Sequence, residues 1–561
     1  MIEKITLKFG SSQNKPKLEI DVKPLTIFVG PNNSGKSAVL RDIVSFCGNG
    51  AIQGPIIESI VLIPVQNIEK EIGKHTLKPI ENENIIEGIT IIIGKRGIRA
   101  SVNVESLRTL FSNPNINLQQ FSELFLKFNV IPLDGANRLQ MISPEGVGDL
   151  KNPINKLSVL FTNDNKRSEV RRVVFEAFNK YFTLDPTSSG QLSIKLSDTE
   201  PLPVIERSLT DEALEYHRNN LPIESTSDGV KAFIGIIISI IADDPKVITI
   251  DEPEAFLHPS LTFKLGKEVG NILNKDISKK VFVSTHSANF LMGSIQSGVS
   301  LNIVRLTYSN NVPTARLLES EKISKLMRHP LLRSVGTLNG LFYEYVVVTE
   351  SDSDRAFYQE INERLLLFAP EKGITNCLFL NAQNKQTVHE IMKPLREMGI
   401  PCAGIVDVDI VKEGGQNWTN LMEGSFVPEL TKKETEISRS NIWNKFKEID
   451  DKKCAEKGIK DFSKRNGGVS VLEKSDKESC NNLFNRLEEY GVFVVRNGEL
   501  ESWLKHFGVT NKYKWLIEIF EKMGDNPNSP DYLKPTNDDV WEFIGNIKNW
   551  FANPLRKGIP E

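Results

Sequence analysis

The sequence predicts an α/β protein with two domains, and three observations lead to this prediction. A glycine-rich loop pattern at residues 30–37 lies between an apolar run and an expected helix. Two further apolar runs, at 247–250 and 280–285, end in carboxylates and in a histidine. A second alternation of strands and helices begins near residue 345. Because such alternation builds parallel sheets covered by helices, we expect one sheet in each half of the chain.

The size and composition limit the class of protein. A chain of 561 residues is too long for one hydrophobic core, so we expect one domain over 1–330 and a second over 340–561. With a formal net charge of −3 the protein has no general attraction to nucleic acid, and any such surface must be local. The five cysteines are scattered and form no C-x-x-C pair, which argues against a zinc knuckle and a disulfide framework. No apolar run is long enough to span a bilayer, so we expect a cytoplasmic protein.

The glycine-rich loop is the most specific motif. Gly30–Ser37 fits the pattern G-x-x-x-x-G-K-[ST] without a mismatch, between an expected strand at Leu25–Val29 and an expected helix from Ala38. In this setting the loop N–H groups and the helix dipole face phosphates. Lys36 is expected to reach the β- and γ-phosphates, and the Ser37 hydroxyl to hold Mg²⁺. The residues expected to bind ATP here are Gly30, Asn32, Asn33, Ser34, Gly35, Lys36 and Ser37.

The remainder of the first domain mixes strands and helices. Residues 1–30 predict a hairpin in front of the loop strand, and 118–128 predicts a helix. The segment 150–182 has helical spacing with basic residues, and we interpret about 150–205 as an insert and a candidate dimerisation arm. Within it, Thr183–Pro203 is rich in Pro, Ser, Thr and Gly, so we interpret that part as a connector.

Two later strands carry polar residues at their ends. The run Val247–Ile250 ends in Asp251 and Glu252. We expect Asp251 to contact the metal and Glu252 to polarise the attacking water. The run from Lys280 ends in His286, a candidate sensor of the γ-phosphate. A lone histidine is more often structural and two adjacent acids are weak evidence alone, but together with the upstream loop they favour an ATPase site.

The second alternation carries its own acids. We expect strands at Tyr345–Thr349 and Ala403–Val408, with Glu350 at the end of the first and Asp407 and Asp409 at the end of the second. Residues i and i+2 of an extended chain face the same side, so Asp407 and Asp409 can share one cation. Carboxylates at the ends of neighbouring parallel strands converge at one edge of the sheet. Oxygen-only ligands suit Mg²⁺ or Mn²⁺; the alternative is that each acid is a solvated loop residue.

Beyond about residue 505 the sequence predicts a helical tail. Its tryptophans are expected to pack in the core: Trp503, Trp515, Trp541 and Trp550. Basic residues upstream are interleaved with acids, so a solvated helix face is favoured over a DNA groove. These residues are Lys445, Lys447, Lys452, Lys453, Lys457, Lys460, Lys464 and Arg465.

The order of motifs in the first domain resembles the ABC-type ATPases of the SMC, RecF and Rad50 class. Asp251–Pro259 resembles their Walker B motif and D-loop, and Ser284–Ser287 resembles their switch-histidine motif. Ser227 and Gly229, candidate ATP contacts, stand where the signature belongs, within a segment that departs from the family pattern. The resemblance implies a homodimer of ATPase heads with two ATP molecules between them. Arg138 is either a further phosphate contact or a surface arginine.

The second domain resembles a Toprim domain, the metal-dependent fold of topoisomerases, primases and certain nucleases. This resemblance implies that Glu350 is a metal ligand or an acid/base group and that Asp407 and Asp409 are metal ligands. The further candidate ligands are Asp354, Glu499 and Glu501, with Glu501 favoured over Glu499. The turn at Leu380–Lys385 departs from the family pattern because it lacks a glycine.

The combination of an ABC-type ATPase head and a Toprim domain resembles the OLD (overcoming lysogenisation defect) family over nearly the whole chain. The resemblance implies a prokaryotic, ATP-regulated, metal-dependent endonuclease of phage or plasmid DNA, like the Gabija nuclease subunit and the retron-associated OLD proteins. It implies ATP and Mg²⁺ or Mn²⁺ as cofactors and a homodimer or higher oligomer. It also implies an operon partner, either a helicase or a retron reverse transcriptase with its msDNA. Two other functions stay open: an ATP-driven DNA-binding or repair scaffold with an inactive Toprim-like domain, and a toxin that cleaves RNA such as tRNA.

Overall fold

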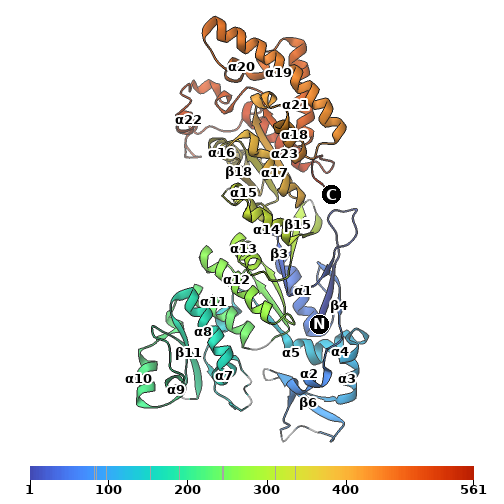
Figure 1. Cartoon of the computed structure of the whole chain (residues 1–561), viewed down its shortest axis with the longest axis vertical. Helices are drawn as coiled ribbons and strands as arrows, with labels where there is room; N and C mark the ends of the chain where they lie inside the picture. The colour runs from blue at the N-terminus through green and yellow to red at the C-terminus, as the bar shows by residue number, and fades with distance from the viewer. Residues whose placement is uncertain are drawn as a thin grey trace. The chain divides into compact units, whose positions relative to one another are not determined.

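The structure of the chain is a computed structural model. It describes residues 1–560 except 81–82, 84, 96–97, 152, 154, 189, 243–244, 310 and 335. The chain divides into two compact units, Met1–Ser324 (unit 1) and Lys325–Glu561 (unit 2), coloured from blue to red along the sequence in Figure 1. Among the described residues, no helix combines the length and the apolar character needed to cross a membrane.

Unit 1 is built on a six-stranded sheet in the order β16-β15-β3-β14-β13-β8. Its strands are β3 (Leu25–Val29), β8 (Val130–Leu133), β13 (Val247–Asp251), β14 (Lys280–Ser284), β15 (Leu301–Ser309) and β16 (Val312–Leu318). All neighbours pair in parallel except β16, which is antiparallel to β15 at the edge. Every residue of β3 is buried, as expected for a strand covered on both faces. The predicted parallel sheet of the first domain is therefore confirmed.

A second, antiparallel sheet lies beside the helix that follows the loop. In it, β1 (Ile2–Leu7) pairs with β2 (Glu19–Asp21) on one side and β4 (Ile57–Leu62) on the other, which confirms the predicted N-terminal hairpin. Helix α1 (Lys36–Asn49) shares one buried core with both sheets, through residues such as Ile5, Ile43 and Phe28. This packing fixes the first turn of α1 at the end of β3.

Smaller elements complete the first part of unit 1, up to residue 140. They are α2 (Ile68–His75), β5 (Thr76–Leu77), β6 (Thr90–Lys95), β7 (Ile98–Asn103), α3 (Val104–Ser112), α4 (Leu118–Phe121), α5 (Lys127–Asn129) and α6 (Asn137–Gln140). The predicted helix over 118–128 is present, but a π-helical turn at Ser122–Leu126 separates α4 from α5. Helices α11 (Asp228–Ile241), α12 (Pro259–Lys275), α13 (Ala288–Gln296) and the beginning of α14 (Ser320–Arg328) follow later in the chain.

The insert of unit 1 differs from its prediction. The expected connector at Thr183–Pro203 is wrong, because β10 (Tyr181–Asp185) and β11 (Gln191–Ser197) form an antiparallel pair there. In β11, buried residues such as Ile194 alternate with partly exposed ones, whereas in β10 every residue after Tyr181 is buried. The turn-forming residues between the two strands concealed both strands in the sequence. The other elements of the insert are β9 (Glu145–Gly146), α7 (Lys156–Thr162), α8 (Asp164–Phe178), α9 (Pro203–Arg207), α10 (Asp211–Asn219) and β12 (Leu221–Pro222).

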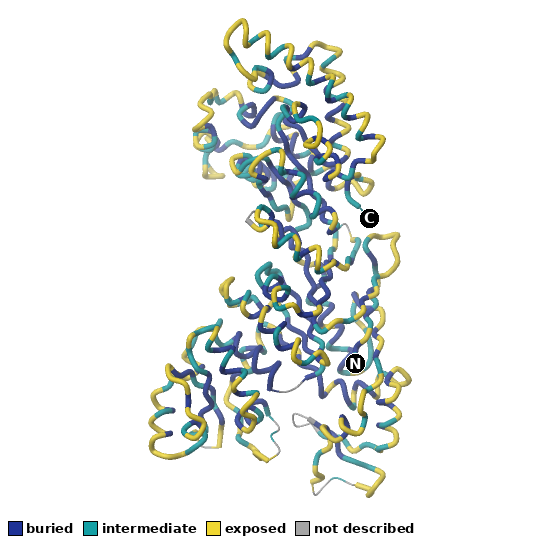
Figure 2. The backbone as a smooth tube through the Cα atoms, viewed as in Figure 1, coloured by how far each residue is buried: buried dark blue, intermediate teal, exposed yellow. Residues whose placement is uncertain are grey.

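Unit 2 is built on a four-stranded parallel sheet in the order β18-β17-β19-β20. The strands are β17 (Tyr345–Thr349), β18 (Cys377–Asn381), β19 (Cys402–Asp407) and β20 (Val492–Val495). Its helices are α15 (Pro330–Ser334), α16 (Asp352–Phe368), α17 (Val388–Glu397), α18 (Gln416–Gly424), α19 (Glu429–Lys457), α20 (Phe462–Arg465), α21 (Lys474–Glu489), α22 (Trp515–Met523) and α23 (Asp539–Ala552). The strands β3, β17 and β20 are buried apart from Tyr345 at the beginning of β17, and Figure 2 colours the backbone by burial. The predicted second sheet is confirmed.

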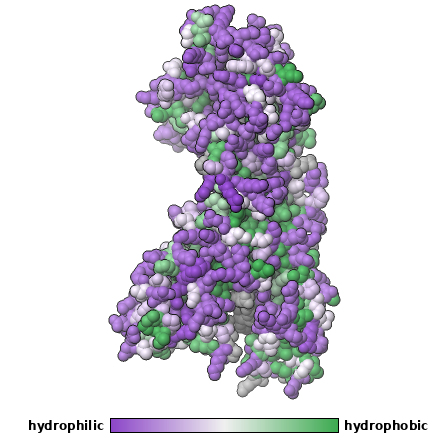
Figure 3. Space-filling view, viewed as in Figure 1, coloured by the Kyte–Doolittle hydropathy of each residue, from purple (hydrophilic) through white to green (hydrophobic). Residues whose placement is uncertain are grey.

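The core of unit 2 contains the tryptophans of the C-terminal tail, and the packing role predicted for them is confirmed: Trp503, Trp515, Trp541 and Trp550. By contrast, α19 carries charged residues to the surface, where Lys445 pairs with Glu448 and Lys453 with Glu456. The face of unit 2 drawn in Figure 3 is mostly hydrophilic.

Replacing Trp541 with Ala is expected to destabilise unit 2 by roughly 3–5 kcal/mol, because a buried indole leaves a cavity. The side chain is 1% exposed in the core of unit 2. All six tryptophans of the chain follow residue 325, so tryptophan fluorescence during urea unfolding reports on unit 2 alone. Leu555→Ala, at a position that is 84% exposed, is the control and should stay within about 0.5 kcal/mol of wild type. Equal midpoints for the two variants would contradict the packing role.

Candidate nucleotide site and candidate metal centre

The glycine-rich loop leads from the end of β3 into α1. Gly30, Asn33 and Gly35 have φ angles of 144°, 61° and 95°, which glycine and asparagine tolerate best. A Cβ on Gly30 would lie 2.0 Å from the carbonyl oxygen of Leu306, so only glycine fits there. The Lys36 ammonium donates to the carbonyl oxygens of Gly30 at 2.9 Å and Pro31 at 2.6 Å. The lysine therefore lies along the loop that phosphates are expected to occupy, and burial lowers its pKa to about 8.

The loop and the predicted metal-binding acid of β13 meet directly. The Ser37 hydroxyl donates to Asp251 Oδ1 at 2.9 Å, and the Ser284 hydroxyl donates to the same oxygen. The strand order places β14 between β3 and β13, so the first turn of α1 and the ends of β13 and β14 supply this contact. A serine hydroxyl next to an aspartate is the pair that holds Mg²⁺ in P-loop enzymes.

Arg138 lies beneath the end of β13 and is 1% exposed. Its guanidinium donates to the carbonyl oxygen of Glu252 at 2.9 Å and to that of Asp251 at 3.4 Å. The interpretation as a surface arginine is therefore wrong, and the phosphate contact stays a prediction. Glu252 has a φ of 50°, a left-handed conformation that is uncommon for glutamate. Arg138 bonds to the backbone on both sides of this strained position.

His286 lies beside Glu252, with Nε2 3.8 Å from Glu252 Oε1. Burial and the neighbouring Lys36 lower the pKa of His286 to about 4, so the ring is neutral at pH 7. Glu254 fixes the histidine backbone, because its carboxylate accepts from the His286 N–H at 2.6 Å and from the Thr285 hydroxyl at 2.7 Å. The sequence analysis assigns no role to Glu254. Its signal in the sequence is its place as the third acid of the Asp251–Glu254 run.

The predicted signature residues lie at the N-terminus of α11. Ser227 is the N-cap residue of that helix and is exposed. A Cβ on Gly229 would lie 2.6 Å from the carbonyl oxygen of Phe256, so the signature segment packs against the predicted D-loop. Phe256 itself has a φ of 70° and is 55% exposed. The roles of Ser227 and Gly229 in ATP binding remain predictions.

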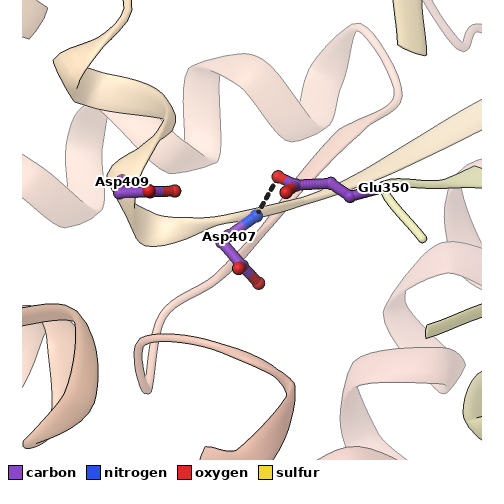
Figure 4. Close-up of side chains that lie close together, drawn as sticks. All are labelled: Glu350, Asp407 and Asp409. Carbon is purple, nitrogen blue, oxygen red and sulfur yellow. Dashed lines mark hydrogen bonds between the residues drawn. The ribbon is translucent and has the colours of Figure 1, made fainter. Parts of the chain in front are cut away.

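In unit 2, three predicted metal ligands converge at the carboxyl edge of the sheet. Carboxylate oxygens of Glu350, Asp407 and Asp409 lie within 4.8 Å of one another. Figure 4 shows them together, with the hydrogen bond of 2.8 Å from the Asp407 N–H to Glu350 Oε1 dashed. The prediction that the two aspartates share one side of an extended strand is wrong. Asp407 ends β19, but Asp409 lies in a 3₁₀ turn at Val408–Lys412, so the turn rather than an extended strand brings it to the cluster.

The pKa values of the three carboxyl groups in the cluster are shifted from their usual values. Burial and the nearby Asp407 carboxylate raise the pKa of Glu350 well above its usual value. Burial also raises the pKa of Asp407 to about 7, although the Lys464 ammonium opposes this shift. Burial acts in the same direction on Asp409, but Lys464 and Lys385 outweigh it and lower the pKa of that carboxyl. Groups perturbed in this way are typical of functional sites.

The cluster fits a hard divalent cation. Asp409 Oδ2 accepts from Lys385 at 2.8 Å, whereas Asp409 Oδ1 is buried without a hydrogen-bond partner among the described residues. A buried carboxylate oxygen without a partner is costly unless a donor or a cation satisfies it. Three carboxylates with no His or Cys suit Mg²⁺ or Mn²⁺. Glu350, Asp407 and Asp409 are therefore the residues that would hold the ion.

The other candidate ligands lie outside this group of three. Asp354 is part of the cap of α16, where it accepts from the Ser351 N–H at 3.0 Å and from its hydroxyl at 2.5 Å. Glu499 accepts from the Lys512 ammonium at 2.6 Å, and Glu501 lies 3.7 Å from the same group. Burial raises the pKa of Asp354 and that of Glu501. Their assignment to a second metal site stays a prediction.

Sequence reasoning missed Lys464. Its place among interleaved acids predicts a solvated lysine, yet its ammonium lies 2.7 Å from Asp407 Oδ2 and 3.2 Å from Asp409 Oδ2. Burial disfavours its charge, but the aspartates outweigh burial and raise the pKa of Lys464. Nothing in the local sequence distinguishes this lysine from its neighbours.

Two family models match the chain. Residues 104–292 match the model described as "AAA domain, putative AbiEii toxin, Type IV TA system". Residues 341–409 match the model described as "Overcoming lysogenization defect protein-like, TOPRIM domain". The chain thus carries an ATPase domain followed by an OLD-like Toprim domain, as the motifs predicted.

Relatives are similar over part of their length. Old nuclease of Escherichia phage P2 is 24% identical over 321 residues, which cover 53% of this chain and 49% of that protein. Endonuclease GajA of Bacillus cereus (strain HuB5-5) is 23% identical over 340 residues, which cover 55% of this chain and 44% of that protein. The chain therefore spans about half the length of these curated relatives. Among solved structures, the SMC head domain from Thermotoga maritima aligns with a TM-score of 0.30 and 14% identity over 57% of this chain and 99% of that one.

Replacing Arg138 with Ala is expected to slow ATP hydrolysis at least about tenfold while the dissociation constant for a fluorescent ATP analogue changes less than about threefold. Arg138 bonds to the carbonyl oxygens of Asp251 and Glu252, so its loss releases the strand end that carries both acids. Steady-state hydrolysis and equilibrium titration measure the two quantities. Lys36→Ala is the comparison, since it should weaken binding of the analogue itself. A binding defect equal to the hydrolysis defect in Arg138→Ala would indicate that Arg138 contacts the phosphates instead.

Replacing Glu350 with Gln is expected to weaken Mn²⁺ binding at least about tenfold, because one of three anionic ligands becomes neutral. Isothermal titration or the electron paramagnetic resonance signal of free Mn²⁺ measures the affinity. Glu363→Gln, at an exposed position on helix α16, which begins two residues after Glu350, removes one negative charge without touching the cluster. An equal loss in both variants would mean that net charge alone, and not the cluster, binds the ion.

Proposed function

Because the chain has the ATPase–Toprim architecture of the OLD family, we propose that it is an ATP-regulated, divalent-metal-dependent DNA endonuclease. We further propose that it acts as an effector of prokaryotic anti-phage defence in the cytoplasm. One observation carries the nuclease proposal: Glu350, Asp407 and Asp409 converge at the carboxyl edge of a parallel sheet. Two relatives, named Old nuclease and Endonuclease GajA, support a nuclease activity.

The proposed cleavage site uses the carboxylates as its framework. Glu350, Asp407 and Asp409 hold the ion, and the Asp407 N–H fixes Glu350 in place. When bound, Mg²⁺ or Mn²⁺ would supply an activated water and would stabilise the charge that develops on the phosphodiester. Burial raises the pKa of the Glu350 carboxyl well above its usual value, and an acid/base role is the alternative to its role as a ligand. Asp354 and Glu501 are the proposed ligands of a second ion.

The proposed ATP site regulates this cleavage. Lys36 and Ser37 bind the phosphates and Mg²⁺ together with Asp251, and Glu252 orients the attacking water. His286 is neutral at pH 7, so it can accept or donate a hydrogen bond at the γ-phosphate. Ser227 and Gly229 of one copy complete the site of the other in a homodimer. The chain would act with an operon partner, a helicase or a retron reverse transcriptase with its msDNA.

The first experiment is plasmid cleavage with Mg²⁺ or Mn²⁺, with and without ATP. Wild type is expected to cut, and Glu350→Ala is expected to lose at least about 99% of the activity, as for a group needed in the transition state. Lys36→Ala gives the sign of the ATP effect, because it removes only the nucleotide contact. Glu363→Gln controls for the change of charge.

The same assay separates the alternatives. Cleavage of added tRNA without cleavage of plasmid would favour the RNA-directed toxin. The opposite outcome is a protein that is saturated with Mn²⁺ and hydrolyses ATP but cleaves neither nucleic acid. This outcome would favour the DNA-binding scaffold and overturn the nuclease proposal.

A further inference from the structure

Lys464 reaches the carboxylate cluster from outside the sheet. It belongs to the short helix α20, which follows the long helix α19. Its ammonium lies 2.7 Å from Asp407 Oδ2, 3.2 Å from Asp409 Oδ2 and 4.0 Å from Glu499 Oε2. The side chain is 22% exposed. One cation of the protein thus touches two of the three residues that would hold the metal.

The backbone around Lys464 is fixed against the turn that carries Glu499. A Cβ on Gly498 would lie 1.9 Å from the Lys464 carbonyl oxygen, and one on Gly468 would lie 2.1 Å from the Arg496 carbonyl oxygen. Both glycines have positive φ angles. The Val469 N–H also donates to Arg496 at 2.8 Å. This close packing holds Lys464 and the segment that follows it at the rim of the cluster.

The Lys464 ammonium and a divalent ion would bind the same carboxylates, those of Asp407 and Asp409. A salt bridge of this length with little exposure is strong, because solvent screens it poorly. The Coulomb energy grows with the product of the charges, so an ammonium repels a divalent ion twice as strongly as it repels a univalent one at the same distance. Among the residues that the structure describes, Lys385 pairs with Asp409 and Glu413, whereas Lys464 bridges Asp407 and Asp409.

We propose that Lys464 is an internal counter-cation of the metal centre: its ammonium neutralises Asp407 and Asp409 and competes with the divalent ion for them. Loading of the site then requires that the ion replace a salt bridge that the protein already makes. Lys464 is thus a positioning residue that keeps the carboxylates together before the ion arrives and lowers the affinity of the site. The inference rests on the proposed metal-dependent function and adds a control of metal loading to it.

The test is the affinity of the purified full chain for Mn²⁺, measured by titration at constant ionic strength without nucleic acid. Lys464→Met keeps the length of the side chain and removes its charge, so the dissociation constant is expected to fall at least about tenfold, or about 1.4 kcal/mol. Lys464→Arg keeps the charge and is expected to stay within about threefold of wild type. Lys460→Met removes an exposed lysine four residues away and is expected to change nothing. An unchanged or higher dissociation constant in Lys464→Met would overturn the proposal.

A second readout follows unfolding of unit 2 by tryptophan fluorescence. In EDTA, Lys464→Met is expected to melt below wild type, because the buried carboxylates lose their counter-charge. Saturating Mn²⁺ is expected to raise its melting temperature by more than it raises that of wild type. An equal rise in both proteins would contradict competition. Should Lys464→Met fail to fold in either condition, Lys464→Gln is judged by the same two criteria.

The outcomes distinguish this inference from the proposed function. If wild type binds Mn²⁺ and cuts DNA but Lys464→Met binds the ion no better, only the role of Lys464 is wrong. If no variant binds Mn²⁺ and wild type does not cut, the metal-dependent function fails, and the inference fails with it.

Discussion

Parallel pairing of strands is the constraint on which the chemistry of both units depends. In unit 1, β14 pairs with β3 and β13, so the glycine-rich loop, Asp251 and His286 follow neighbouring strand ends. In unit 2, β17 pairs with β19, and Glu350 therefore meets Asp407. Since side chains alternate between the faces of a sheet, a shift of one residue in either register would turn every strand residue to the opposite face. The buried strands exclude such a shift and thereby fix both sites.

Parallel pairing brings carboxylates close together at the strand ends, and each unit offsets their repulsion with different partners. In unit 1, Asp251 accepts from two hydroxyls and Glu254 accepts from a hydroxyl and an N–H group. In unit 2, the carboxylates face two lysines, Lys385 and Lys464, and one N–H group. Buried charges persist only with such partners. The hydroxyl partners in unit 1 leave the aspartate anionic and accessible to a cation. The ammonium partners in unit 2 neutralise the aspartates before a metal ion binds.

The sequence was informative where the signal is local. Runs such as Tyr345–Thr349 end where the structure ends them, because β-branched residues bounded by polar ones are typical of buried strands. The glycine loop and its helix were equally clear. The position of Asp409 in a 3₁₀ turn was not, since a two-residue spacing is the same in a strand and in a turn. The partners of Lys464 and Arg138 depend on contacts across long stretches of sequence, for which composition and periodicity carry no signal.

The order of elements along the chain has a consequence for synthesis. Glu350 follows β17 and Asp407 ends β19, and both strands leave the ribosome before β20, which begins only at Val492, after α18, α19, α20 and α21. A growing chain emerges from its N-terminus, and β20 must close a long crossover before it can pair with β19. Until then the sheet has an open edge, and neither Glu499 nor the glycine that supports Lys464 is in place. A nascent or prematurely terminated chain thus holds the acids without the framework that organises them, so translation itself delays the assembly of the centre.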